Sequence, residues 1–206
     1  MAKDSTNRRR RPKGNKRERT RARLVDAAAA VIGEQGWDRT SLDEVARRAG
    51  MTRGAIYGNF ANREELFLAV VQTRWKPVAP PYTPGTTFRQ HMHAVGKALA
   101  AAGPERRAQA LGALSFMLYA LTHEEMRTQV TKLNAELYKR MAEGLTRVFR
   151  RDELPMAPAH LVPTLHALSD GLTFLRVLMP ELITEKVIVA AFDAVAGGPA
   201  PFHAPS

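Results

Sequence analysis

The feature that most constrains this chain is a glycine, Gly50, between two short amphipathic stretches. Ser41 precedes the first stretch and can cap a helix. Apolar residues then follow at the i, i+3, i+4, i+7 spacing of a single helix face: Leu42, Val45, Ala46 and Ala49. Gly50 can end that helix in a left-handed conformation, and Thr52 can cap a second helix that runs to Phe60. The spacing is that of a helix-turn-helix.

The second helix is predicted to have two different faces. Ala55, Ile56 and Phe60 can pack against the first helix, and the opposite face is small, polar and aromatic: Thr52, Arg53, Gly54, Tyr57, Gly58 and Asn59. Small residues let a helix sit deeply in the major groove, Arg and Asn can bond base edges, and hydroxyls reach phosphates. The pair favours DNA binding, although a helical hairpin that only packs has the same core spacing.

The flanking sequence resolves this ambiguity. A long amphipathic helix is predicted over 17–35, and a further helix follows Asn62. The segment from Arg23 to Val71, with AAAAVIGEQGWDRTSLDEVARRAGMTRGAIYGNFANREELFLAVV, resembles the N-terminal domain of the TetR family of transcriptional regulators. The resemblance covers about a quarter of the chain and is highly specific in motif.

This resemblance implies roles for individual residues. Thr40 and Tyr57 would contact phosphates, and Arg63 stands at the usual Lys position, where either cation can bind a phosphate. Gly58 departs from the larger side chain common there, which implies fewer bases read or a closer backbone approach. Thr52, Arg53, Gly54, Ala55 and Asn59 would lie at or near base edges. The complete set of predicted DNA contacts is Arg17, Thr40, Ser41, Thr52, Arg53, Gly54, Ala55, Tyr57, Gly58, Asn59 and Arg63.

Positive charge is concentrated at the start of the chain. Residues 1–23 hold 11 of the 31 Lys and Arg residues against Asp4 and Glu18, and so carry +9 of the net +11. Residues 1–16 have few apolar side chains, so we expect a disordered basic arm that binds DNA in a salt-dependent way with little sequence preference. A leader that never touches DNA is the competing interpretation. No apolar stretch follows the charges, which excludes a signal peptide.

The composition restricts other functions. The chain has no Cys and no run of 18 apolar residues, so we expect no disulfide, no thiolate metal site and no membrane span. We therefore expect a soluble, cytoplasmic protein without a metal or cofactor. His91 and His93 point apart at i, i+2 on a helix, and no Ser-His-Asp set, phosphate loop or carboxylate pair is visible. His166 and Asp170, at i, i+4, favour a local contact, and we expect no enzyme activity.

Prolines divide the rest of the chain. The expected organisation is an arm (1–16), a helix-turn-helix domain (17–74), a Pro-rich linker (75–85), a helical ligand-binding and dimerisation domain (86–198) and a tail (199–206). In the last domain we predict helices over 86–102, 104–121, 123–151, 158–179 and 181–196. No strand pattern appears. The predicted fold is all-α, with an N-terminal three-helix helix-turn-helix domain and a helical C-terminal domain.

Apolar residues of the last two predicted helices form a regular seam. Leucines recur at steps of four and three, as in helices that pack against a partner helix, and 167–172 resembles the family's dimerisation helix. An intramolecular core seam has the same pattern. The residues predicted to form a homodimer are Leu161, Leu165, Leu168, Leu172, Leu175, Val187 and Ala191.

The middle helices are rich in aromatic residues and methionine, which can line an adaptable pocket or an ordinary core. The family resemblance implies an unknown small-molecule effector that changes the spacing of the DNA-binding domains. The predicted ligand contacts are Phe88, Met92, Phe116, Met117, Tyr119, Leu137 and Phe174.

The sequence therefore predicts a dimeric, sequence-specific regulator, a repressor that a small hydrophobic ligand releases from a near-palindromic operator in double-stranded DNA. A general DNA-coating protein driven by the basic arm is the alternative. A helical enzyme is a third hypothesis, and it would not need Tyr57.

Overall fold

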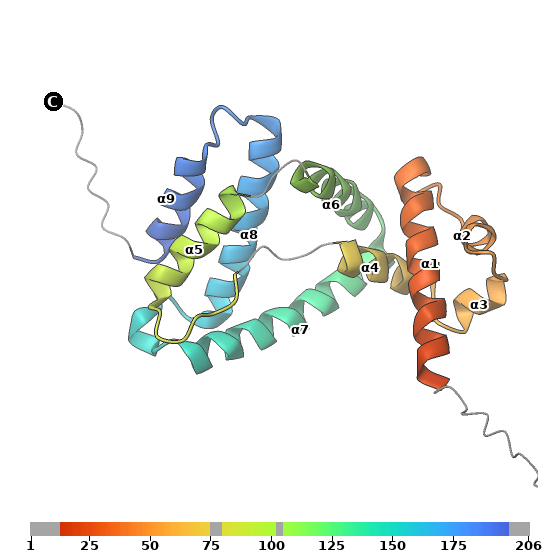
Figure 1. The fold of residues 1–206 in the computed structure, drawn as a ribbon, viewed down its shortest axis with the longest axis horizontal. Helices are drawn as coiled ribbons and strands as arrows, with labels where there is room; N and C mark the ends of the chain where they lie inside the picture. The colour runs from red at the N-terminus through yellow and green to blue at the C-terminus, as the bar shows by residue number, and fades with distance from the viewer. Residues whose placement is uncertain (1–12, 75–79, 102–104, 198–206) are drawn as a thin grey trace, which may run out of the picture. The chain divides into compact units, whose positions relative to one another are not determined.

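The computed structural model describes residues 13–74, 80–101 and 105–197. All regular secondary structure in these ranges is helical, which confirms the predicted fold class (Figure 1). The chain divides into two compact units, Met1–Thr73 and Arg74–Ser206.

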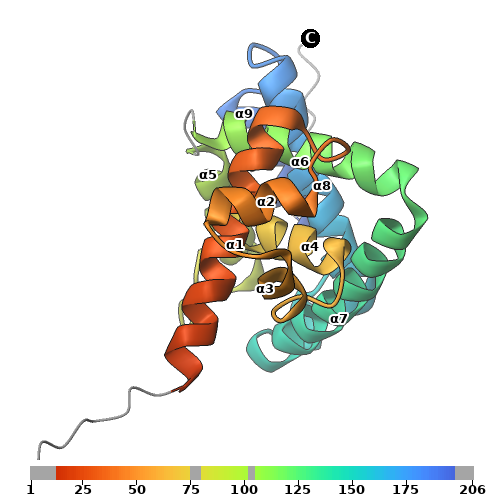
Figure 2. The same ribbon diagram turned by 90° about the vertical axis from the view of Figure 1, so that its right-hand side faces the viewer.

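Four helices build the first unit: α1 (Lys13–Gln35), α2 (Leu42–Ala49), α3 (Arg53–Tyr57) and α4 (Arg63–Arg74). Figure 2 shows α2 and α3 joined by a short turn, with α1 beside α2. Each helix contributes fully buried side chains to one core: Leu24, Val31, Val45, Ile56, Leu66 and Phe67. Trp37, in the loop after α1, meets the Phe67 ring edge-on at 5.3 Å between centroids. This core fixes the mutual orientation of α2 and α3.

Two boundaries in this unit differ from the prediction. Helix α1 begins at Lys13, so residues 13–16 are helical and not part of an arm; residues 1–12 of the predicted arm lie outside the described residues. A helix already nucleated extends at one hydrogen bond per residue, and this extension continues through Gly14 and Asn15 although both residue types have low helix propensity. Helix α3 ends at Tyr57 and not at Phe60, because a turn follows at Gly58 and Asn59.

The second unit contains α5 (Phe88–Ala100), α6 (Glu105–Thr122), α7 (Glu124–Val148), a 3-10 turn η1 (Arg151–Glu153), α8 (Pro158–Leu178) and α9 (Glu185–Val195). Helices α5, α8 and α9 enclose a core that includes Phe88, Met92, Leu161, Ile188 and Phe192. Helix α5 lies along α9, and α7 packs against α6 and α8 (Figure 1).

Gly96 sets the distance between α5 and α9. A Cβ on this residue would lie 3.1 Å from the Val189 Cα and 3.3 Å from the Phe192 Cβ. Two helices can therefore approach here closely only because the position carries no side chain.

Helix boundaries in this unit follow capping chemistry. Thr87 and Gln90 form a capping box at the start of α5, and Thr184 caps α9. Helix α9 thus begins after Thr184 and not at residue 181 as predicted. In the predicted linker, residues 80–85 are non-helical, whereas 75–79 and the predicted tail at 199–206 lie outside the described residues.

Candidate nucleic-acid interface

The turn between α2 and α3 has the backbone geometry expected for a helix-turn-helix. The Ser41 hydroxyl accepts a hydrogen bond from the Glu44 N–H at 3.2 Å and caps α2. Gly50 has φ +62°, and the Met51 N–H bonds the Ala46 carbonyl at 2.9 Å. This left-handed helix end directs the chain into α3 at a fixed angle.

The outer face of α3 is exposed. Tyr57 is 51% exposed, and Arg53 and Gly54 are exposed as well. Thr52 has the extended backbone of a helix cap, yet its side chain makes no capping hydrogen bond. The Thr52 hydroxyl is therefore open to an external partner.

Arg53 is held in place within the protein. Its guanidinium lies 3.1 Å from the nearer Asp43 carboxylate oxygen and donates to the Tyr57 hydroxyl at 3.3 Å. These two contacts raise the pKa of Arg53, the Tyr57 hydrogen bond contributing most. The group combines a cation, a hydroxyl and a carboxylate on one exposed surface.

Gly54 and Gly58 are not required by the fold. A Cβ on Gly54 would meet the Thr52 hydroxyl at 3.7 Å, and one on Gly58 would meet the Gly54 carbonyl oxygen at 3.4 Å, both ordinary contacts. Both residues are exposed, and neither has a positive φ. Their small size therefore leaves room for an external partner.

Two of the predicted DNA contacts have their polar groups turned inward. Thr40 is 2% exposed, and its hydroxyl donates to the Gly36 carbonyl at 2.8 Å. The Asn59 amide nitrogen donates to the Ala55 carbonyl at 2.8 Å, and its amide oxygen is buried without a hydrogen-bond partner. As they lie in the structure, neither side chain is presented to a ligand.

Arg63 is also used within the fold. Its guanidinium donates to the carbonyls of Trp37, Asp38 and Thr40 at 2.8, 3.2 and 3.0 Å. It also lies 4.6 Å from the centre of the Phe67 ring. These contacts fasten the loop before α2 to the start of α4, a role that the sequence did not indicate.

Helix α1 supplies both structural and exposed cations. Arg21 donates to the Asn59 carbonyl at 2.7 Å and lies 4.1 Å from the centre of the Phe60 ring. Arg23 donates to the Ala49 carbonyl at 2.8 Å. Lys16 and Arg17 are exposed on the first turns of the same helix. The number of Lys and Arg residues does not show which cations are structural and which are exposed, because tertiary contacts decide which cations remain available.

The cations of α2 are paired. Arg47 and Arg48 bond Glu44 and Glu34 at 2.5 and 2.6 Å, and these bonds lower the pKa of both carboxyl groups. The exposed face of α3 and the start of α1 therefore form the candidate nucleic-acid interface.

The predicted ligand contacts differ in their exposure. Phe88 and Met92 are 1% and 3% exposed in the core, and Tyr119 is buried and stacked on His123. Phe116 and Phe174 are half-buried, and Met117 and Leu137 are 42% and 38% exposed. Phe88 and Met92 thus serve as ordinary core.

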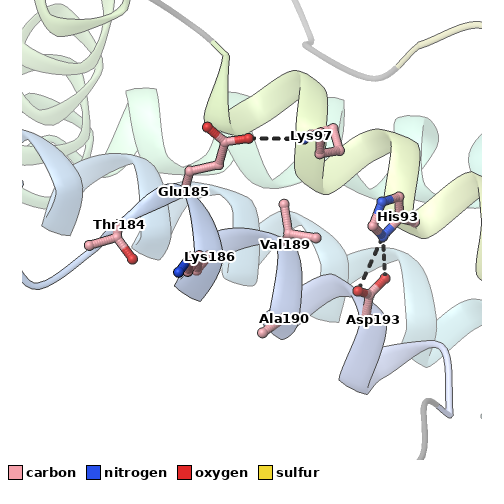
Figure 3. Close-up of a pocket in the computed structure, with 8 residues that line it drawn as sticks. All are labelled: His93, Lys97, Thr184, Glu185, Lys186, Val189, Ala190 and Asp193. Atoms are coloured by element: carbon pink, nitrogen blue, oxygen red, sulfur yellow. Dashed lines mark hydrogen bonds and ion pairs between the residues drawn. The ribbon is translucent and has the colours of Figure 1, made fainter.

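A groove of about 810 Å³ lies between α5 and α9 (Figure 3). Val189 and Ala190 line it, with a hydrogen bond of 3.1 Å joining His93 to Asp193 and an ion pair of 3.1 Å joining Lys97 to Glu185. The predicted ligand contacts do not include any of these residues.

Most residues of the predicted dimer seam lie in the second unit's own core. Leu161 and Leu172 are buried there, and Leu165, Leu168 and Ala191 pack against it. The intramolecular alternative therefore accounts for these five. Leu175 and Val187 are each 41% exposed, and Leu178 and Leu182 are 74% and 68% exposed. The exposed apolar side chains thus include two of the seven predicted residues, Leu175 and Val187, together with Leu178 at the end of α8 and Leu182 in the loop before α9.

His166 and Asp170 make the local contact that their spacing predicted, at 3.3 Å. The Tyr138 hydroxyl bonds the other ring nitrogen of His166 at 2.5 Å.

Within the described residues, none of the helices is long and apolar enough to cross a membrane.

Known proteins resemble both units. A family model described as bacterial regulatory proteins of the tetR family matches residues 24–70. A second model, the C-terminal part of BetI-type transcriptional repressors, matches residues 88–197.

Individual relatives agree with these families. The chain is 40% identical over 78 residues to the HTH-type transcriptional regulator SrpR of Pseudomonas putida, a match that spans 38% of this chain and 37% of SrpR. The crystal structure of a TetR-family regulator from Rhodococcus sp. has a TM-score of 0.67 at 20% identity, over 87% of this chain and 99% of that one. The multidrug binding protein EbrR, complexed with imidazole, has a TM-score of 0.61 at 20% identity, over 90% and 92%.

Proposed function

Since the chain belongs to the TetR family of transcriptional regulators, we propose that it is a dimeric, sequence-specific repressor that a small hydrophobic ligand releases from a near-palindromic operator. The exposed face of α3 carries this proposal. Thr52, Arg53 and Tyr57 offer hydrogen-bonding groups there, and Gly54 leaves space for a close approach. Binding, and not turnover, is the proposed activity, and it would take place in the cytoplasm, where bacterial DNA lies.

The phosphate contacts we propose come from the cations that the fold leaves exposed. Lys16 and Arg17 lie on α1 one turn before Arg21, and both are exposed. We propose that these two cations and the Tyr57 hydroxyl bind phosphates. Thr40, Asn59 and Arg63 would act indirectly, by fixing the loop and the end of α3, unless their side chains rearrange on binding. Ser41 and Ala55 would contribute through backbone position.

For dimerisation, we propose the exposed apolar face of α8 and α9. Leu175 and Leu178 lie at the end of α8, Leu182 lies in the loop that follows, and Val187 lies in the first turn of α9; all four are more than 40% exposed. A two-fold dimer would place two α3 helices in successive major grooves, about 34–36 Å apart, and so favour a near-palindromic site.

For the effector, we propose a site among the half-buried and exposed apolar residues of α6, α7 and α8: Phe116, Met117, Leu137 and Phe174. The multidrug binding protein EbrR, complexed with imidazole, has the same fold, which supports a small-molecule site. A ligand that weakens DNA binding by some factor must itself bind the DNA-bound protein more weakly by the same factor, because the two equilibria are linked.

Selection of bound duplexes from a random pool at near-physiological salt tests this function. We compare the wild type with Tyr57→Ala and with Arg127→Ala, which serves as the control for truncation of an exposed side chain outside the first unit. The wild type and Arg127→Ala should enrich one near-palindromic motif, and Tyr57→Ala should not. Salt-sensitive binding without enrichment in the wild type would instead support a general DNA-coating protein.

A further inference from the structure

We propose that Asp43 acts through Arg53 as a specificity-determining residue, by holding the guanidinium in position to read a guanine in each half-site. The inference rests on the proposed function, since it assumes sequence-specific binding through α3.

Arg53 makes polar contacts on two sides. Its Nη1 donates to both carboxylate oxygens of Asp43, at 3.1 and 3.4 Å, and its Nη2 donates to the Tyr57 hydroxyl at 3.3 Å. The guanidinium carbon also lies 5.8 Å from the centre of the Tyr57 ring. Asp43 belongs to α2 and Tyr57 to the next turn of α3, so the two contacts restrain the long side chain between two helices.

The restrained guanidinium keeps donors available for a base. It has five N–H groups, and the contacts with Asp43 and Tyr57 leave several of them free in its plane. Guanine presents O6 and N7 as paired acceptors in the major groove, and arginine bonds both. A side chain that is already ordered loses less conformational entropy on binding, which sharpens the preference for the base that fits.

Helix capping does not account for Asp43. Ser41 caps α2, and Glu44 supplies a second carboxylate to the same helix start. Asp43 places a negative charge beside Arg53, on the surface that would face phosphates, and phosphates repel it. One carboxylate thus weakens binding to any DNA and orients the cation that distinguishes one base.

This dual effect gives a distinctive test. Removal of an ordinary DNA contact lowers affinity, whereas Asp43→Asn should raise affinity for random DNA and lower discrimination. Glu44→Gln is the matched control, because it removes a carboxylate from the same helix turn. The Glu44 carboxylate pairs with Arg47 and Arg48 and not with Arg53.

The experiment measures dissociation constants at one salt concentration for three duplexes: the selected operator, a random duplex and an operator with one base pair changed. The changed base pair is the one at which the Arg53→Ala variant no longer prefers the wild-type base. For Asp43→Asn we expect affinity for random DNA to rise about two- to threefold and discrimination at that base pair to fall about five- to tenfold. Glu44→Gln should give a similar rise with unchanged discrimination. Asp43→Glu should retain part of the discrimination.

A double-mutant comparison isolates the coupling. In the Arg53→Ala background, Asp43→Asn should not reduce discrimination further. The inference is wrong if Asp43→Asn keeps wild-type discrimination, or if it reduces discrimination equally with and without Arg53. If the wild type itself shows no base preference, it is the proposed function that fails, and this outcome is seen before any variant is made.

Discussion

Arg63 shows how a residue in a DNA-binding pattern can act on the fold. Its guanidinium donates to the carbonyls of Trp37, Asp38 and Thr40, so its removal leaves the loop before α2 without this support. We expect Arg63→Ala to lower the free energy of unfolding by about 2 kcal/mol, since hydrogen bonds to a charged group are among the stronger ones. Urea denaturation measures this, and Arg63→Lys should lose less.

A phosphate role for Arg63 gives the opposite result. Arg63→Ala would then unfold at the wild-type urea concentration and lose only DNA affinity. The size of the stability change therefore separates the two roles.

Two histidines predict opposite responses to pH. Burial beside the rings of Tyr82 and Phe149 lowers the pKa of His91, and the hydrogen bond to Asp170 raises the pKa of His166. As the pH falls below about 6.5, the unfolded chain protonates at His91 before the folded chain does, so the folded state loses stability. The stabilisation by His166 is complete below about 6.5 and is lost as the pH rises through its folded pKa.

Single substitutions should separate these contributions. His91→Asn should reduce the loss of unfolding free energy between about pH 6.5 and pH 5, and Asp170→Asn should reduce the loss between about pH 6.5 and pH 8. Urea titrations at the three pH values measure both. An unchanged profile in either variant would rule out that residue as the source.

Helix α3 is the element whose stability and function should conflict. Gly54 lies inside a helix of five residues, and a Cβ there would clash with nothing. Gly54→Ala should therefore raise the free energy of unfolding by about 0.5–1 kcal/mol while lowering operator affinity about tenfold or more, because the methyl group occupies the space left for DNA. Thermal unfolding and operator binding measure the two effects.

Gly144 provides the matched control. It lies within α7, in the other unit, and a Cβ there meets nothing within 4 Å, so it too can be added without a clash. Gly144→Ala should give a comparable stabilisation with unchanged operator affinity. If Gly54→Ala binds the operator as the wild type does, the close approach of α3 to DNA is refuted.

The helices were largely predictable from local signals, and their partners were not. Apolar spacing and proline positions predicted all nine α-helices of the described residues, and no helix end is shifted by more than four residues, including those of α3 and α7, which each stop three residues early. The signals at Thr87 and Thr184 would have placed two starts more closely. By contrast, the leucines of α8 would show the same spacing whether they packed against a second subunit or against the core of their own subunit. The spacing therefore did not show that Leu161 and Leu172 lie in the core.

The candidate site shows the same limit. The motif predicted the exposure of Arg53 and Tyr57, because an amphipathic pattern indicates which face of a helix turns outward. It did not show that Thr40 and Asn59 bond carbonyls four residues earlier in the chain, a local alternative that these side chains share with solvent exposure. Nor did it show the carbonyl partners of Arg63, which depend on how the chain folds back on itself. Periodicity defines faces, and tertiary contacts define which polar groups remain free.

At the scale of the whole molecule, the proposed repressor depends on two copies binding together. Two linked DNA-binding units hold an operator far more tightly than one, because the second contact is made at a high effective concentration. Leu178 and Leu182, at 74% and 68% exposure, are the most exposed large apolar side chains of the face proposed for the dimer. A charge at either position would have to be buried in the interface, which is strongly unfavourable.

We therefore expect Leu178→Glu with Leu182→Glu to give a folded monomer whose operator affinity falls about a hundredfold or more, with weak binding to half-sites retained. Sedimentation and operator titration measure the two effects, and circular dichroism checks the fold. Leu118→Glu is the control, since Leu118 is 65% exposed but lies on α6. If the double variant remains a dimer, the subunits meet on another surface. If it is a monomer with full operator affinity, the two half-sites are not bound cooperatively, and the argument for a palindromic operator fails.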